Sequence, residues 1–152
     1  MTLANFERSI EEKRKFGLDR KTFYEMFERG YAPLNFDADN KKFAKKIARK
    51  LLKEFKNCEI MFRKSASRRG YHFTIFKNGK QLFLPIKKVI AIRKRIGDCI
   101  GRLSCDILRS EHNLPIGILF DHKAKIGKKF KFATKWKKLE KVGDLDGRNR
   151  KS

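Results

Sequence analysis

Apolar residues recur with a helical period in several segments of the chain. Between residues 40 and 56, Phe43, Ile47, Leu51 and Phe55 recur at every fourth position, with lysines and an arginine opposite them. Such a stripe predicts an amphipathic helix that buries one face. Shorter patterns of the same kind, each closed by a glycine, predict helices over residues 5–16, 19–30 and 86–95.

Other segments alternate between apolar and polar residues, which is typical of strands. We expect strands over residues 34–40, 59–63, 71–76, 81–84, 102–109 and 115–121. The pair Asn78-Gly79 predicts a β-hairpin between two of them, because both residues tolerate a positive φ. From residue 34 on, the element order β-α-β-β-α-β is that of a split βαβ unit. The sequence therefore predicts an α+β fold: a ferredoxin-like or RRM-like sheet behind two N-terminal helices.

The length of 152 residues suits one compact core. We expect an N-terminal helical segment over residues 1–30 and an α+β core over residues 31–123. Residues 124–152 are rich in lysine and have few regularly spaced apolar positions. They are predicted to form a basic C-terminal extension that ends as a flexible tail.

The charge of the chain indicates what kind of partner it binds. The chain has 40 Lys and Arg against 17 Asp and Glu, a net charge of +23. Residues 1–40 carry 7 basic and 8 acidic side chains, so residues 41–152 carry the remaining 33 and 9, a net charge of +24. A surface with this much self-repulsion indicates a polyanionic partner. We expect nucleic acid, DNA rather than RNA, to bind the part of the chain that follows residue 40.

The sequence favours a cytoplasmic protein without a membrane span. Charged residues make up 38% of it, its apolar stretches are only a few residues long, and no export signal is visible. Its three cysteines form no Cys-x-x-Cys pair and are expected to be reduced thiols. Cys99, Cys105, His112 and His122 lack the tight paired spacing of structural zinc motifs, so no zinc is assigned.

Asp37 and Asp39 are the first candidate for chemistry. They are separated by one residue at the end of a predicted strand, so both side chains point to the same face. Two carboxylates so placed repel each other unless a cation lies between them, and Mg²⁺ or Mn²⁺ is commonly held this way beside substrate phosphates. The alternative is that these acids cap the helix that follows.

A basic loop over residues 64–70 is the second candidate. It combines Ser65, Ser67, Arg68 and Arg69 with a glycine, and His72 follows on the next strand. Hydroxyl, guanidinium and backbone N–H groups in one short loop can bind a triphosphate. The alternative is a basic hairpin edge with a surface histidine.

Together these segments resemble motifs of the archaeo-eukaryotic primase superfamily over roughly residues 31–123. Residues 34–39, Leu-Asn-Phe-Asp-Ala-Asp, are similar to its hhhDhD first motif, and residues 67–72, Ser-Arg-Arg-Gly-Tyr-His, to its second motif. Residues 102–109, Arg-Leu-Ser-Cys-Asp-Ile-Leu-Arg, resemble its third motif, a hydrophobic residue followed by aspartate. Ser65-Ala66-Ser67 departs from the usual Ser-Gly, and the chain is small for the superfamily.

The resemblance implies template-directed nucleotidyl transfer from nucleoside triphosphates by two metal ions. Mg²⁺ or Mn²⁺ would be held by Asp37, Asp39 and Asp106, with Asp121 as the alternative to Asp106. The incoming nucleotide's phosphates would be bound by Ser65, Ser67, Arg68, Arg69 and His72, with Arg102, Arg109 and Lys123 as further phosphate neighbours. Nucleic acid would be bound by Lys42, Lys46, Arg49, Lys53, Lys56, Lys128, Lys129 and Lys131, with Trp136 as a base-stacking platform.

The sequence is compatible with three functions. The first is a primase-like nucleotidyltransferase of archaeal, viral or plasmid origin, with a helicase or another replication subunit as a possible partner. The second is a non-catalytic basic protein that binds nucleic acid on a primase-like or RRM-like fold. The third is a metal-dependent nuclease, because clustered acids and phosphate-binding bases also serve hydrolysis.

Overall fold

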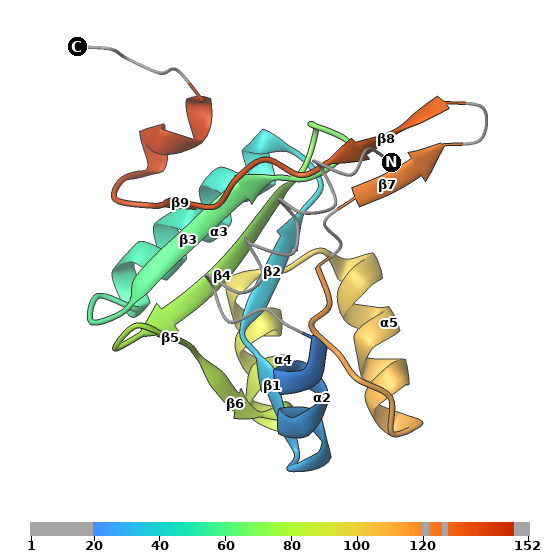
Figure 1. Ribbon diagram of the computed structural model, residues 1–152. Coiled ribbons are helices and arrows are strands. Elements are labelled where there is room, and N and C mark those ends of the chain that lie inside the picture. Colours follow the sequence, from blue (N-terminus) through green and yellow to red (C-terminus); the bar gives the residue numbers. More distant parts are fainter. Residues whose placement is uncertain (1–19, 120–121, 126–127, 148–152) are drawn as a thin grey trace.

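The computed structural model describes residues 20–119, 122–125 and 128–147 (Figure 1). Its helices are α2 (Arg20–Glu28), α3 (Lys41–Glu54), α4 (Ile86–Ile96), α5 (Ile100–Glu111) and the 3-10 helix η1 (Val142–Asp146). Its strands are β1 (Tyr31–Pro33), β2 (Asn35–Ala38), β3 (Glu59–Lys64), β4 (Tyr71–Lys77), β5 (Lys80–Gln81), β6 (Phe83–Pro85), β7 (His122–Lys125), β8 (Lys128–Phe132) and β9 (Lys137–Lys138). The predicted helix over residues 5–16 lies outside the described residues.

The main sheet has the strand order β2-β4-β3-β9, and β5 pairs with β4. The chain runs from β2 through α3 to β3, and β4 lies between these two strands, antiparallel to both. Two smaller sheets pair β1 with β6 and β7 with β8. The fold is therefore α+β with antiparallel sheets, as the sequence predicts.

Helix α3 confirms the longest helical pattern of the sequence. The side chain of Asn40 caps it by accepting a hydrogen bond of 3.0 Å from the backbone N–H of Phe43. Its buried residues are Ala44, Ile47, Ala48 and Leu51, whereas the Phe43 side chain, expected on the apolar stripe, is 48% exposed. Burial along α3 therefore begins at Ala44.

The core lies between one face of the main sheet and the helices α3 and α4, which stand behind the sheet in Figure 1. Strand residues Phe36, Phe73 and Ile75 are fully buried there against α3 and α4. Because side chains alternate along a strand, the residues between them point to the opposite face of the sheet. Most of the buried strand residues on that face, called the polar face below, are polar: Asn35, Arg63, His72, Thr74 and Gln81. Met61 and Phe76 on the same face are apolar and buried.

The predicted hairpin is present, but its second strand is interrupted and forms two short strands, β5 and β6. Asn78 and Gly79 adopt positive φ values of 54° and 78° at the turn between β4 and β5. After β5, Leu82 donates its N–H to the Ile75 carbonyl over 2.8 Å, and the chain then leaves β4 so that β6 pairs with β1. The helix predicted over residues 86–95 is confirmed as α4, which ends at Gly97 with a φ of 101°.

Two predicted strands are wrong. Residues 102–109 belong to α5, whose buried side chains Leu103 and Asp106 are three positions apart, a helical and not an alternating spacing. Residues 115–119 form no regular element, and Gly117 there has a φ of 82°. The remaining positions of that predicted strand, 120 and 121, lie outside the described residues.

The expectation of a tail is wrong for residues 132–147. Strand β9 extends the main sheet along β3, and η1 packs against α3. Leu139 and Leu145 join the main core with exposures of 3% and 0%, and the Tyr71 hydroxyl donates to the Leu145 carbonyl over 2.9 Å. A few well-placed leucines thus make this lysine-rich segment part of the folded unit.

None of the described helices is both long enough and apolar enough to cross a lipid bilayer.

Candidate active site at the Asp37 and His72 strand pair

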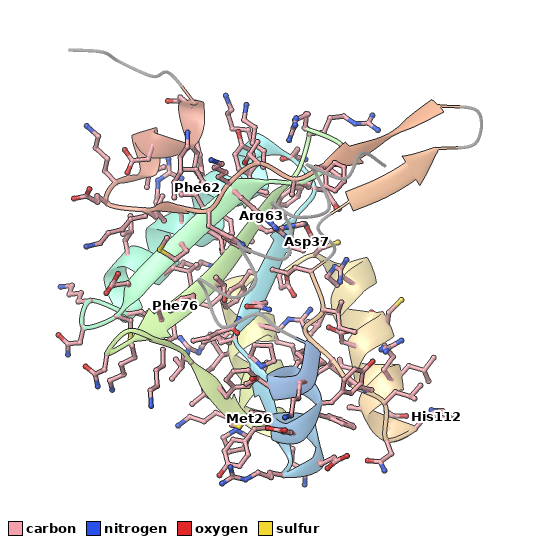
Figure 2. The ribbon with its side chains drawn as sticks, viewed as in Figure 1. Met26, Asp37, Phe62, Arg63, Phe76 and His112 are labelled. Carbon is pink, nitrogen blue, oxygen red and sulfur yellow. The ribbon has the colours of Figure 1, made fainter. Side chains whose placement is uncertain are left out.

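Asp37 on β2 and His72 on β4 are direct cross-strand partners on the polar face of the main sheet. The histidine Nε2 lies 3.7 Å from the Asp37 Oδ1, and the side chains are 6% and 18% exposed. Figure 2 shows Asp37 and Arg63 toward the same end of the sheet. The pair therefore forms a largely buried acid and base whose separation is fixed by the strand register.

Arg102 of α5 contacts the other oxygen of Asp37. Its Nε donates to the Asp37 Oδ2 over 2.7 Å, and its Nη1 donates to the Ile118 carbonyl over 2.6 Å. Burial raises the pKa of Asp37 above its ordinary value, the Arg102 ion pair lowers it by less, and the charge of Asp39 adds to the rise. The Asp37 carboxylate is therefore short of compensating positive charge even with its arginine partner.

Arg63 of β3 orients the histidine from the other side. Its Nε donates to the His72 Nδ1 over 3.1 Å, and its guanidinium carbon lies 4.4 Å from the centre of the Trp136 ring. Because Nδ1 accepts this hydrogen bond, the proton of a neutral His72 ring is on Nε2, the nitrogen nearest Asp37. Trp136 is 6% exposed and packs on Met61 and Phe76, so its predicted role as a base-stacking platform is wrong.

Asp39 lies just beyond the end of β2 and is exposed. The Cys99 thiol donates to the Asp39 Oδ2 over 3.3 Å, and the Cys99 N–H donates to the Asp37 carbonyl over 3.1 Å. Burial, with a further contribution from the Asp39 carboxylate, raises the pKa of Cys99. The turn between α4 and α5 thus contacts the end of β2 at both acids.

The loop over residues 65–70 meets the same end of the sheet. Its ends are joined by a 2.9 Å hydrogen bond from the Ser65 N–H to the Gly70 carbonyl, and the hydroxyls of Ser65 and Ser67 lie 3.0 Å apart. A Cβ on Gly70 would lie 2.6 Å from the Ala38 carbonyl oxygen, so only glycine lets the loop approach β2 this closely. The predicted phosphate loop is therefore directly beside the segment that carries Asp37 and Asp39.

Arg68 and Arg69 of this loop are exposed. Arg68 adopts a φ of 66°, and the Arg69 N–H donates to the Ser67 hydroxyl over 3.3 Å. The loop thus presents two guanidinium groups to solvent at the edge of the site, where an anionic ligand can reach them.

Asp106 does not join Asp37 and Asp39. It is 5% exposed on α5, where its Oδ2 accepts hydrogen bonds of 2.6 Å from Arg93 Nη1 and 3.1 Å from the Gly117 N–H. Arg93 also pairs with Asp98, and the Asp98 Oδ1 accepts a 2.7 Å hydrogen bond from the Asp37 N–H. Asp106 is thus part of a buried ion-pair network, which contacts the backbone of β2 through Asp98.

Four residues of this arrangement are not predicted by the sequence patterns. Arg93 and Asp98 carry the buried network, Arg63 orients His72, and Cys99 contacts Asp39. One signal was available, because Arg93 lies among Val89, Ile92 and Ile96 on the apolar side of a predicted helix. A charge at such a position requires a buried partner.

The remaining predicted residues make other contacts or lie on exposed surface. The Arg109 Nε donates to the Pro115 carbonyl over 2.7 Å and so ties the segment after α5 to this helix. This is a structural contact and not the predicted contact with a phosphate. The basic side chains predicted on α3, Lys42, Lys46, Arg49, Lys53 and Lys56, are all exposed. They point away from the sheet, whereas Asp37 and His72 lie on its opposite face.

Lys123 lies on β7, and Lys128, Lys129 and Lys131 lie on β8. Asp121, the alternative third carboxylate, lies outside the described residues. Within the described ranges, no three His, Cys, Asp or Glu side chains are grouped so as to hold a metal ion.

Comparison of the chain with protein-family models, curated proteins and solved structures gave no match.

Proposed function

We propose that the chain is a primase-like nucleotidyltransferase with a ferredoxin-like core, which binds DNA and joins nucleotides to it. The observation that carries this proposal is the convergence of two separate sequence segments. Strand pairing sets Asp37 opposite His72, and the loop over residues 65–70 packs against the end of β2 beside Asp39. Acids that could hold a cation and a loop that could hold phosphates are thus neighbours.

The capping alternative for the two acids loses its support. Asn40, and neither Asp37 nor Asp39, provides the side chain that caps α3. Asp37 lies on a strand, 18% exposed, in a position where an uncompensated carboxylate costs folding free energy. A carboxylate in such a position without a capping role is a candidate for function.

We propose that a divalent cation binds between Asp37 and Asp39. Their carboxylates are close enough for the charge of Asp39 to raise the pKa of Asp37, and a bound cation would relieve this repulsion. Mg²⁺ or Mn²⁺ bound there would activate the attacking hydroxyl and neutralise the triphosphate. Asp106, held by Arg93, does not fit as a third ligand.

The chain's own residues would bind and orient the nucleotide. Arg68 and Arg69, exposed at the edge of the site, would bind the outer phosphates, and the Ser67 hydroxyl would offer a further hydrogen bond. His72, with its Nε2 proton directed into the site by Arg63, would donate to a phosphate oxygen. Arg102 would hold Asp37 in place through its Nε.

The test is nucleotide incorporation by wild-type protein and the variant D37N/D39N. Both should be assayed for primer extension and de novo primer synthesis with labelled nucleotides in Mg²⁺ and in Mn²⁺. Amide oxygens are poor substitutes for carboxylates around a hard cation, so we expect incorporation to be lost and nucleic-acid binding to be retained. D146N, which removes an exposed carboxylate on η1, is the matched control and should keep full activity.

Undiminished incorporation by D37N/D39N would overturn the assignment of these acids. A nuclease control on the same substrates separates transfer from hydrolysis, and metal-dependent degradation without incorporation would favour the nuclease. D106N should lower the melting temperature, because it weakens the pairing with Arg93, and should leave the metal concentration needed for activity unchanged. A shift of that concentration would return Asp106 to the metal site.

A non-catalytic nucleic-acid-binding protein is the second candidate, and it is favoured by the ion pairs. Arg102 contacts Asp37 and Arg93 contacts Asp106, so two of the three predicted metal carboxylates have arginine partners. Under this function, binding follows from the net charge of +24 over residues 41–152. Wild-type protein would be inert in every incorporation assay while its affinity for nucleic acid would fall by ~10³ between 50 and 200 mM salt, if about six phosphates are neutralised.

A further inference from the structure

The two-stranded sheet β7–β8 is set apart from the main sheet. Figure 1 shows it as a ribbon that extends away from the body of the molecule. Its described residues are 122–125 and 128–132, which include five lysines and no acid. The hairpin is therefore a separate element with a dense positive charge.

Both ends of this hairpin are attached beside the candidate site. On the side that leads into β7, the Ile118 carbonyl accepts a hydrogen bond from Arg102, the residue that also contacts Asp37. On the side that leaves β8, Thr134 and Lys64 exchange two hydrogen bonds: the Thr134 N–H donates to the Lys64 carbonyl over 3.0 Å, and the Lys64 N–H donates to the Thr134 hydroxyl over 2.8 Å. Lys64 directly precedes the loop over residues 65–70. The hairpin thus starts and ends on either side of the pair formed by Asp37 and His72.

The strand register sets lysine opposite lysine. Lys123 pairs with Lys131 and Lys125 pairs with Lys128, with a register irregularity between the two pairs. Like charges directly opposite each other destabilise an antiparallel pair. The register therefore sets like charges at two facing positions, and a bound polyanion would offset them.

We propose that the β7–β8 hairpin is a basic arm that binds the phosphate backbones of a double-stranded nucleic acid next to the candidate site. The proposal rests on the proposed function for its choice of nucleic acid as the partner, but not on catalysis. A two-stranded ribbon has the dimensions to enter the major groove of a duplex. Because its two ends flank the site, a duplex held by the arm would place a strand end near Asp37 and the loop over residues 65–70.

The test compares two variants that each remove three positive charges. K125Q/K128Q/K131Q alters the arm, and K87Q/K88Q/K94Q alters three exposed lysines of α4. Affinity for a 20-base-pair duplex and for a single strand of the same length is measured by fluorescence anisotropy over a salt series. Both variants have the same net charge, so a difference between them reports the place of contact and not the overall field.

We expect the arm variant to bind the duplex more weakly than the α4 variant does. If three phosphate contacts are lost, the slope of log K against log salt should become shallower by about 2.7, since each contact contributes ~0.9. Its melting temperature should equal or exceed that of wild type, because lysine repulsion is removed. A smaller variant, K125Q/K128Q, gives the same comparison should the larger one unfold.

Equal duplex affinity and slope in the arm and α4 variants would overturn the proposal. So would an equal loss of affinity for single strand and duplex, because the arm would then show no preference for a duplex. The result of this binding test can be distinguished from the result of the incorporation test of the proposed function. An arm effect with a wild type inert in incorporation removes catalysis alone, whereas incorporation that depends on Asp37 without an arm effect removes the arm alone.

Discussion

Asp37 and His72 are held as cross-strand partners, with the His72 Nε2 3.7 Å from the Asp37 Oδ1. Both residues belong to paired strands of one antiparallel ladder, and neither lies on a loop. Their separation therefore depends on how closely β4 approaches β2. Immediately before β4, Gly70 passes close to the Ala38 carbonyl at the end of β2.

The first prediction concerns this close approach. A Cβ on Gly70 would lie 2.6 Å from the Ala38 carbonyl oxygen, a contact that backbone movement alone can relieve. We expect Gly70→Ala to destabilise the protein by about 1–3 kcal/mol, the usual cost of overpacking, and to shift His72 away from Asp37. Urea unfolding measures the first effect. Loss of nucleotide incorporation at a temperature where the variant remains folded measures the second.

Gly101 provides the control for this substitution. It lies on α5, and a Cβ there would meet no atom within 4 Å. Because alanine favours a helix more than glycine does, Gly101→Ala should be neutral or stabilise by up to about 1 kcal/mol. Equal unfolding free energies for the two variants would mean that the close approach at Gly70 does not hold the strands in place.

Sequence patterns predicted the elements whose burial is periodic. The stripe on α3, the turn at Asn78 and Gly79, and α4 all appear near their expected positions because local chemistry determines them. Proximity of the loop over residues 65–70 to Asp39 is a different kind of result. The resemblance in motif order implied it, and the structure brings these segments together through the pairing of β2 with β4.

Asp106 shows what sequence patterns could not predict. The sequence predicts a strand over residues 102–109, but the apolar spacing around Asp106 also fits a helix, and the helix is what forms. Its partner Arg93 is 13 positions away on another helix, and no local period links the two. Buried ion pairs between elements depend on tertiary packing, so neither the network nor its contact with the Asp37 N–H was visible in the sequence.

The second prediction tests whether the C-terminal segment belongs to the core. Leu145 of η1 is 0% exposed and packs in the main cluster, although the segment around it is charged. Leu145→Ala should destabilise the protein by about 2–5 kcal/mol, as for other buried leucines. Leu108→Ala, at a side chain that is 58% exposed on α5, should change the unfolding free energy by less than about 0.5 kcal/mol. Similar small changes in both variants would restore the interpretation of this segment as a tail.

The third prediction uses the pKa of Asp37, which burial raises above its ordinary value of 3.8. Below that value the side chain is protonated in both folded and unfolded chains and contributes nothing. As pH rises through 3.8, the unfolded chain ionises first, so the folded state loses stability until the raised folded pKa is passed. Asp37→Asn removes this loss, and its melting temperature relative to wild type should therefore be higher at pH 7 than at pH 3.

Asp146 supplies the opposite sign within the same protein. Hydrogen bonding and charge from Lys45, with a contribution from Lys41, lower the pKa of this exposed carboxyl. Its stabilising effect is present above pH 3.8 and is lost as pH falls through the lowered value, so Asp146→Asn should be relatively less stable at pH 7 than at pH 3. Thermal unfolding of both variants and wild type between pH 3 and 7 measures the two slopes. Parallel slopes for Asp37→Asn and Asp146→Asn would mean that Arg102 compensates the Asp37 charge fully, and a bound cation would then have no repulsion to relieve at this site.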